Sequence, residues 1–350
     1  MRLRSRVKAV ALRAIDRFAG RRGSLGATME RLAPYLRRRP DPRRGGDLVP
    51  PERGLGRSVV RVAPTRPIFI TGRFRSGTTL VWNVFRQLPG NTAYYEPLNE
   101  RRWVDPARRG SRVDPTHRGV ASYWDEYEGM ADLAPRFRSR WHDRNLYMGA
   151  DARDPALRRY VAALVGRAPR RPVLQFNRID FRLPWIRSRF PDAAVLHLVR
   201  NPRDLWCSIL MDPLAFPSDA TVAAFARHDH FYLRMWVEAL GAVFPCLPAG
   251  YAAHPYRAHY LLWRLSLAFG LAYGDATVTF EDIMIRPRET VSAVAEFAGL
   301  ESSSIDGAVA LVAPPRLQVW KDYASDDWFR RHEDVAEYLL TSLSRGGVWG

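Results

Sequence analysis

The sequence predicts an α/β protein in which helices flank a single parallel sheet, preceded by a basic N-terminal extension. Short apolar, β-branched runs alternate with segments of helical periodicity, as strands and crossover helices do in parallel sheets. The chain has 350 residues, of which 47% are hydrophobic, enough for one sizeable core. At 67–85 a turn with two glycines joins an apolar run to a helical one, an arrangement that suits an anion-binding loop.

That stretch, 67–85, reads PIFITGRFRSGTTLVWNVF. Residues 67–71 have the composition of a buried strand, and apolar residues recur at helical spacing from Leu80 onward. The turn, Gly72-x-x-x-x-Gly77-Thr78-Thr79, imitates the P-loop, in which backbone N–H groups surround a phosphate. Nucleotide triphosphatases place a lysine after the second glycine, and Thr78 stands there instead. We therefore expect a P-loop-like site that binds a single phosphate without a metal.

Two stretches resemble one family. The run Arg75-Ser76-Gly77-Thr78-Thr79 after a strand resembles the 5′-phosphosulfate loop of sulfotransferases that use 3′-phosphoadenosine 5′-phosphosulfate (PAPS). Residues 193–208, AAVLHLVRNPRDLWCS, read as a strand, then Arg200, then a helix carrying Ser208, and resemble the family's 3′-phosphate site. The arginine before Ser76 is nearer to tyrosylprotein and bacterial carbohydrate or lipid sulfotransferases than to the cytosolic small-molecule group. The resemblance implies PAPS as co-substrate, no metal, and binding by Arg75, Ser76, Gly77, Thr78, Thr79, Arg200 and Ser208.

Glu96 follows a second predicted strand, 92–95, at the carboxyl edge where open α/β sheets bind ligands. A glutamate in a similar place is the catalytic base of several related sulfotransferases, and the resemblance gives Glu96 that role. The alternatives are a surface carboxylate or a helix cap before Pro97, with Glu100 as the nearest rival base. Arg178, after a predicted strand at 172–176, stands where relatives often stabilise charge on the transferring group, so it joins Arg75 as a catalytic candidate. Lys321 is a candidate for the 3′-phosphate.

The net charge of +18 comes from 54 basic residues, all of them arginine except Lys8 and Lys321. So uniform a preference for arginine over lysine is as typical of a GC-rich, bacterial genome as it is of a protein that binds polyanions. No zinc-ligand spacing or RNA-binding aromatic signature accompanies it, and we expect no nucleic acid. Two cysteines, no long apolar run and no secretory signal predict a reducing, cytoplasmic location.

The chain divides into an extension, 1–60, and a domain, 61–350. Residues 1–22 are expected to form a basic amphipathic helix that would lie on an anionic membrane, at its inner face, or pack on the domain itself. Residues 36–57 read as an Arg/Pro/Gly-rich arm, and 101–170 as an acceptor-side insertion whose aromatics either bind the acceptor or form core.

Toward the C-terminus we expect helices at 218–245, 256–272 and 303–312, a strand at 276–283 and a helix from Pro287. His228 and His230, in the first of these helices, are weaker candidates for the active-site edge.

These observations predict a PAPS-dependent sulfotransferase acting on a hydroxyl acceptor such as a glycan, a glycolipid or a small natural product. Two other classes stay open. A metal-dependent P-loop kinase would need the missing lysine and a metal-binding aspartate. A non-catalytic nucleotide- or polyanion-binding protein would have no use for Glu96, and its affinity would fall steeply with salt.

Overall fold

A five-stranded parallel sheet forms the centre of the molecule, with its strands in the order β2-β3-β1-β4-β5. The structure is a computed structural model that describes residues 24–43, 48–55, 61–110, 112–300, 305–313 and 316–345. The expected amphipathic helix at 1–22 lies outside these residues. The strands are β1 (Ile68–Gly72), β2 (Asn91–Tyr95), β3 (Arg171–Phe176), β4 (Ala194–Val199) and β5 (Ala276–Thr279). The predicted fold class, a parallel sheet flanked by helices, is confirmed.

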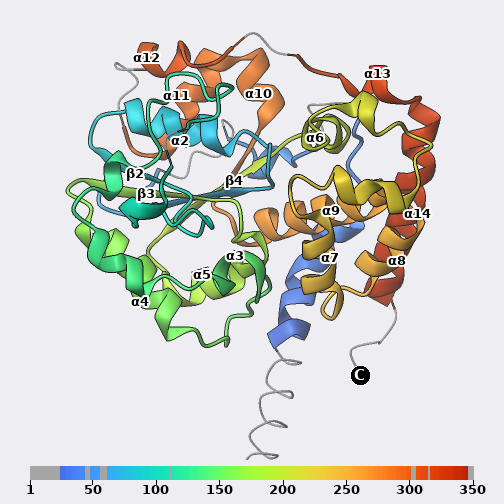
Figure 1. The fold of residues 1–350 in the computed structure, drawn as a ribbon, viewed down its shortest axis with the longest axis horizontal. Coiled ribbons are helices and arrows are strands. Elements are labelled where there is room, and N and C mark those ends of the chain that lie inside the picture. Colours follow the sequence, from blue (N-terminus) through green and yellow to red (C-terminus); the bar gives the residue numbers. More distant parts are fainter. Residues whose placement is uncertain are drawn as a thin grey trace, which may run out of the picture.

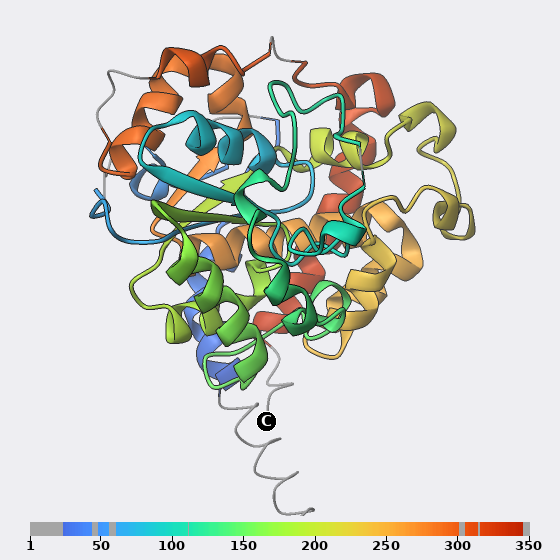
Figure 2. The same cartoon turned by 60° about the vertical axis from the view of Figure 1, so that its left-hand side comes forward.

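Helices cover both faces of this sheet (Figures 1 and 2). α2 and α10 to α12 lie on one face, and α4, α5 and α9 lie on the other. Residues 24–37 are also helical. The remaining bounds are α2 (Thr78–Gln87), α3 (Arg140–Asp143), α4 (Pro155–Arg167), α5 (Leu183–Arg189), α6 (Pro202–Ile209), α7 (Leu233–Gly241), α8 (Cys246–Ala253), α9 (Pro255–Tyr273), α10 (Phe280–Ile285), α11 (Pro287–Phe297), α12 (Asp306–Val309), α13 (Trp320–Tyr323) and α14 (Asp326–Arg345).

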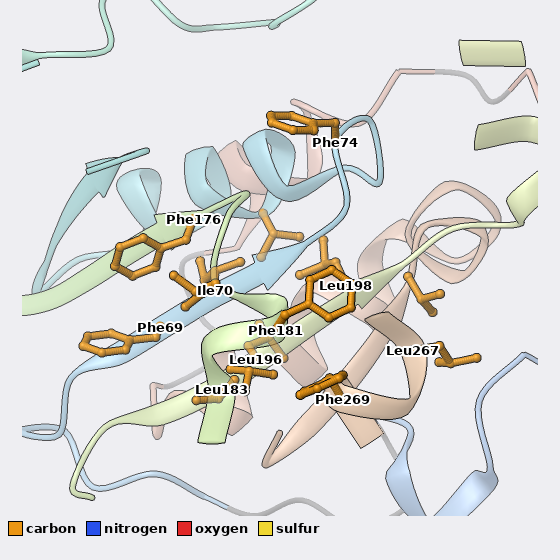
Figure 3. Packing of buried hydrophobic residues seen from close by; sticks show 14 of the residues in the cluster. Phe69, Ile70, Phe74, Phe176, Phe181, Leu183, Leu196, Leu198, Leu267 and Phe269 are labelled. Atoms are coloured by element: carbon orange, nitrogen blue, oxygen red, sulfur yellow. The ribbon is translucent and has the colours of Figure 1, made fainter. Parts of the chain in front are cut away.

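The strands are buried along their whole length, which explains their continuous apolar sequences. Phe69 and Ile70 of β1 and Leu196 of β4 pack in one cluster with Phe269 of α9 (Figure 3). The register pairs Ile70 with Leu196, so the two central strands end at the same level. The loop after β1 and the residues after β4 therefore meet at one edge of the sheet.

The described residues before Arg61 pack on this core, although the sequence suggested an arm outside the domain. Leu25 and Leu32 of the helix at 24–37 are buried, as are Leu48 and Val49 beyond it. The carbonyl oxygen of Leu36 accepts a hydrogen bond of 2.9 Å from the Arg264 side chain in α9. These segments therefore contribute buried residues next to α9.

The C-terminal half keeps some of the expected elements and departs from others. The helix expected at 218–245 is interrupted, because the carboxylate of Asp229 accepts from the backbone N–H groups of Leu233 and Arg234 and starts α7 there. α9 and α11 lie where they were predicted. The strand expected at 276–283 ends at Thr279, whose hydroxyl accepts from the N–H of Asp282 and caps α10. Of the helix expected at 303–312, residues 305–312 are described, and only Asp306–Val309 is helical, as α12.

Candidate active site

A cavity of about 700 Å³ lies at the carboxyl edge of the sheet. All five strands contribute to its lining, through residues that directly follow them. The loop after β1 forms one wall, the segment after β2 forms another, and 112–118 closes the side. Ligands of open α/β sheets bind at this edge, so the position matches the expectation from the sequence.

The loop between β1 and α2 has a conformation that depends on its glycines. A Cβ on Gly72 would lie 2.5 Å from the carbonyl oxygen of Leu198, because the loop packs directly on β4. Gly77 caps α2 with a φ of 94°, in the left-handed region. The first N–H groups of α2, from Thr78 onward, have no partner within the helix and lie at the cavity wall. This end of the loop fits an anion such as a phosphate.

A Gly77→Ala change tests whether this conformation is needed. The new methyl group would lie 2.7 Å from the ring of Phe280, and the positive φ would strain an alanine. We expect a loss of about 1–3 kcal/mol in unfolding free energy and weaker binding of 3′-phosphoadenosine 5′-phosphate (PAP), measured by denaturation and calorimetry. Gly90→Ala is the matched control, since Gly90 has a φ of 80° with no atom within 4 Å of the added Cβ. Gly90→Ala should lose stability and keep its affinity for PAP. Equal affinities for PAP in both variants would contradict the assignment of this loop as a phosphate-binding site.

Glu96 directly follows β2 and points a nearly buried carboxylate at the cavity. The side chain of Asn177 donates a short hydrogen bond to Oε1. Asn99 Nδ2 donates to Oε2 at 2.5 Å, and Arg178 Nη1 donates to the same oxygen at 3.4 Å. The backbone of Glu96 has a φ of 38°, which is rare outside glycine and concentrates at functional sites. The residue is thus held in a strained position facing the space beside the loop.

A model of the sulfotransferase family matches residues 67–240, a span that includes the loop, Glu96 and Arg200. The chain belongs to the sulfotransferase family. No match is found among curated proteins.

Three solved structures are similar to this sulfotransferase. A sulfotransferase from Alicyclobacillus acidocaldarius is 18% identical, covering 82% of this chain and 99% of that one, with a TM-score of 0.38. The sulfotransferase domain of the Synechococcus PCC 7002 olefin synthase is 16% identical over 83% and 98%, with a TM-score of 0.40. A sulfotransferase from Mycobacterium avium is 17% identical over 80% and 77%, also with a TM-score of 0.40.

The two carboxylates of this sulfotransferase site differ in their electrostatics. Burial raises the pKa of Glu96 above its ordinary value, and the Arg178 guanidinium only partly opposes this. Burial would also raise the pKa of Glu100, but Arg178 and hydrogen bonds, including one from Tyr232, lower it overall. Arg178 Nη2 lies 2.6 Å from Glu100 Oε2, and the Tyr232 hydroxyl donates to Oε1 at 2.8 Å. Of the two carboxylates, Glu96 therefore has the higher pKa and is the more easily protonated.

Arg178 lies between these two carboxylates. Its guanidinium carbon is 5.0 Å from the centre of the Phe74 ring, and the side chain is 2% exposed. Because it bridges Glu96 and Glu100, it neutralises part of their charge. It also lines the cavity, so its position agrees with a role in stabilising charge there. It acts in addition on the Glu96 carboxylate.

The two motifs that the sequence suggested for the two phosphates of PAPS meet in the structure. Arg75 Nε donates to Ser208 Oγ at 3.1 Å, and Arg200 Nη1 donates to the carbonyl oxygen of Arg75 at 3.1 Å. The Arg200 guanidinium stacks 4.4 Å from the centre of the Phe280 ring. Arg75, Arg200 and Phe280 line the cavity, while Ser208 stands behind Arg75.

Ser76 and Lys321 are not among the residues that line the cavity. The Ser76 hydroxyl and N–H both donate to the carbonyl oxygen of Arg73, so they close the turn and leave no donor for a ligand. Lys321 is exposed on α13, donates to Gln318 and is not among the cavity residues. Of the two candidate histidines, His230 lines the cavity, whereas His228 packs on Phe216.

Sequence reasoning missed Asn177 and Phe280, which both line the cavity. Asn177 directly follows the strand predicted at 172–176, and Phe280 lies within the strand predicted at 276–283. Their positions near the ends of strands could have indicated that they line the site. The aromatics of the 101–170 insertion differ in where they lie relative to the cavity. Trp103 borders the cavity while being 4% exposed, and Trp141 is core beneath α4 and packs on Tyr160.

Two classes of feature are absent from the described part of the chain. In those residues no group of three or more His, Cys, Asp and Glu side chains could hold a metal ion. None of the helices that the structure describes is long and apolar enough to cross a membrane.

Proposed function

We propose that this protein transfers the sulfuryl group of PAPS to a hydroxyl group of its acceptor. The observation that carries the proposal is that one cavity holds both a lysine-free, P-loop-like turn and the buried carboxylate of Glu96. The turn supplies the N–H groups at the start of α2 for a phosphate, and Arg75 and Arg200 supply positive charge. The residues present therefore fit the 5′- and 3′-phosphate groups of PAPS.

PAPS would supply an activated sulfuryl group on a good leaving phosphate. Glu96 would accept the acceptor's hydroxyl proton at a carboxylate oxygen as the new S–O bond forms and the bridging S–O bond to phosphate breaks. Arg75 and the N–H groups at the start of α2 would neutralise charge on the departing phosphate. Arg178 would hold Glu96 in place and stabilise negative charge at the sulfuryl oxygens.

The proposal is tested by transfer of label from ³⁵S-PAPS to fractionated cell extracts, followed by identification of the product. We expect a labelled product that contains a sulfate ester and appears at equal yield with a metal chelator. Glu96→Gln is the matched negative control. Binding of PAP without any labelled product would favour the non-catalytic nucleotide-binding alternative, and loss of activity with the chelator would contradict the metal-free site.

A further inference from the structure

Asn177 is placed between the proposed base and the phosphate-binding loop by the order of the strands. β3 lies between β2, which ends before Glu96, and β1, which ends at the loop. A side chain that directly follows β3 can therefore reach both neighbours. Asn177 is that residue, 6% exposed and lining the cavity.

The side-chain amide of Asn177 forms hydrogen bonds through both its oxygen and its nitrogen. Its Oδ1 accepts from the Thr78 hydroxyl at 2.8 Å and from Gln175 Nε2 at 3.0 Å. Its Nδ2 donates to Glu96 Oε1. Gln175 is fully buried, and its Oε1 accepts from the backbone N–H of Glu96 at 3.3 Å. Because two donors converge on Oδ1, the NH₂ group must face Glu96.

We propose that Asn177 is a positioning residue that connects Glu96 to Thr78 of the phosphate-binding loop and keeps the Glu96 carboxylate ionised and correctly oriented. Only the consequence for transfer rests on the proposed function, because the contacts themselves do not depend on the reaction. A donor to a carboxylate stabilises its charged form. Loss of the Asn177 donor should therefore make Glu96 harder to ionise and free its side chain to rotate.

Other groups also influence the ionisation of Glu96, and they stay in place when Asn177 is changed. Asn99 is the neutral donor to the second carboxylate oxygen. The charged and titratable groups that face Glu96 are Arg178 after β3, Glu100, Tyr95 of β2, Tyr123 and Tyr127 of the 122–127 segment, and Tyr232 before α7.

The titration of Glu96 itself tests the proposal. Carboxyl-¹³C labelling of glutamate allows each side chain to be followed by NMR, and the Glu96 signal is the one missing from Glu96→Gln. In Asn177→Leu the pKa of Glu96 should rise by about one to two units, as expected for losing a hydrogen bond to a charged group. Asn177→Asp keeps the size and the acceptor oxygen but puts a second negative charge beside Glu96, so it should shift the pKa in the same direction.

Asn83→Leu is the matched control. Asn83 is a buried asparagine of α2 that lines the same cavity and donates to the carbonyl oxygen of Arg118 at 2.9 Å. The Glu96 titration should be unchanged in this variant. An unchanged Glu96 titration in folded Asn177→Leu would overturn the proposal, as would an equal shift in Asn83→Leu. If Asn177→Leu does not fold, Asn177→Ala, which removes the donor without adding a charge, decides by the same criterion.

Transfer assays then test whether the contacts of Asn177 with Glu96 and Thr78 matter for the reaction. In Asn177→Leu, kcat should fall about 10- to 100-fold, and the acid limb of its pH profile should move up by the shift seen in the titration. The affinity for PAP, measured by calorimetry, should change little, because the N–H groups of the loop are untouched. A wild-type protein that shows no transfer while the NMR shift is present would refute the proposed function and leave the role of Asn177 in holding Glu96 supported.

Discussion

Glu96→Gln should lower turnover by about 10²- to 10⁴-fold, the range for loss of a positioned general base, with PAP affinity nearly unchanged. Glutamine keeps the shape of the side chain but cannot accept the acceptor's proton. In the wild type, burial raises the pKa of Glu96, and the base must be ionised to act. The rate should therefore rise with pH through this raised pKa, and the limb should vanish in Glu96→Gln.

Glu100→Gln is the control for this experiment, because it removes a neighbouring carboxylate that shares Arg178. Turnover at neutral pH should change little. The negative charge of Glu100 contributes to the raised pKa of Glu96, so its removal should move the acid limb to lower pH. Wild-type turnover in Glu96→Gln would place the base elsewhere, with Glu100 and His230 the next to test. If Glu96→Gln loses both turnover and affinity for PAP, the role of Glu96 is structural.

Arg200→Ala should weaken PAP binding by about 10- to 100-fold, which corresponds to loss of one charge-assisted contact worth about 1.5–3 kcal/mol. Arg200 lines the cavity beside Phe280 and is the guanidinium that the resemblance assigns to the 3′-phosphate. Calorimetry should be run with PAP and with adenosine 5′-phosphate, which lacks that group. The variant should lose most of its preference for PAP, and Ser208→Ala should lose less.

Arg66→Ala is the control for charge alone, since Arg66 lies before the amino end of β1 and donates to the carbonyl oxygen of Asp192. Its affinity for both nucleotides should match the wild type. Equal weakening of both nucleotides in Arg200→Ala would contradict the 3′-phosphate assignment. It would mean that Arg200 acts by holding the loop through the carbonyl oxygen of Arg75.

Local patterns were sufficient to predict the elements that build the site. β1, β3 and β4 were each predicted from an apolar run, β2 from a short segment at 92–95, and α2 from helical spacing after two glycines. Parallel strands share one carboxyl edge, so residues directly after them converge. For that reason Arg75, Glu96, Arg178 and Arg200 could be selected from the sequence, and all four line one cavity. The prediction of one helix at 218–245 was wrong. The carboxylate of Asp229 accepts from the N–H of Leu233 at the start of α7, and periodicity does not reveal such a side-chain contact.

The sequence by itself determined the fold class, the lysine-free loop and the acidic residue at the sheet edge, because each is encoded by neighbouring residues. Only the tertiary structure decided which distant groups touch. The strand order inserts β3 between β2 and β1, and so brings Asn177 to Thr78 across 99 positions of sequence. It also makes Glu96 and Glu100 share Arg178, which lowers the pKa of both carboxyls, while burial leaves the pKa of Glu96 raised. Hydrogen bonds and charge coupling act over a few ångströms of space, and the order of strands that creates such proximity is set by packing of the whole core.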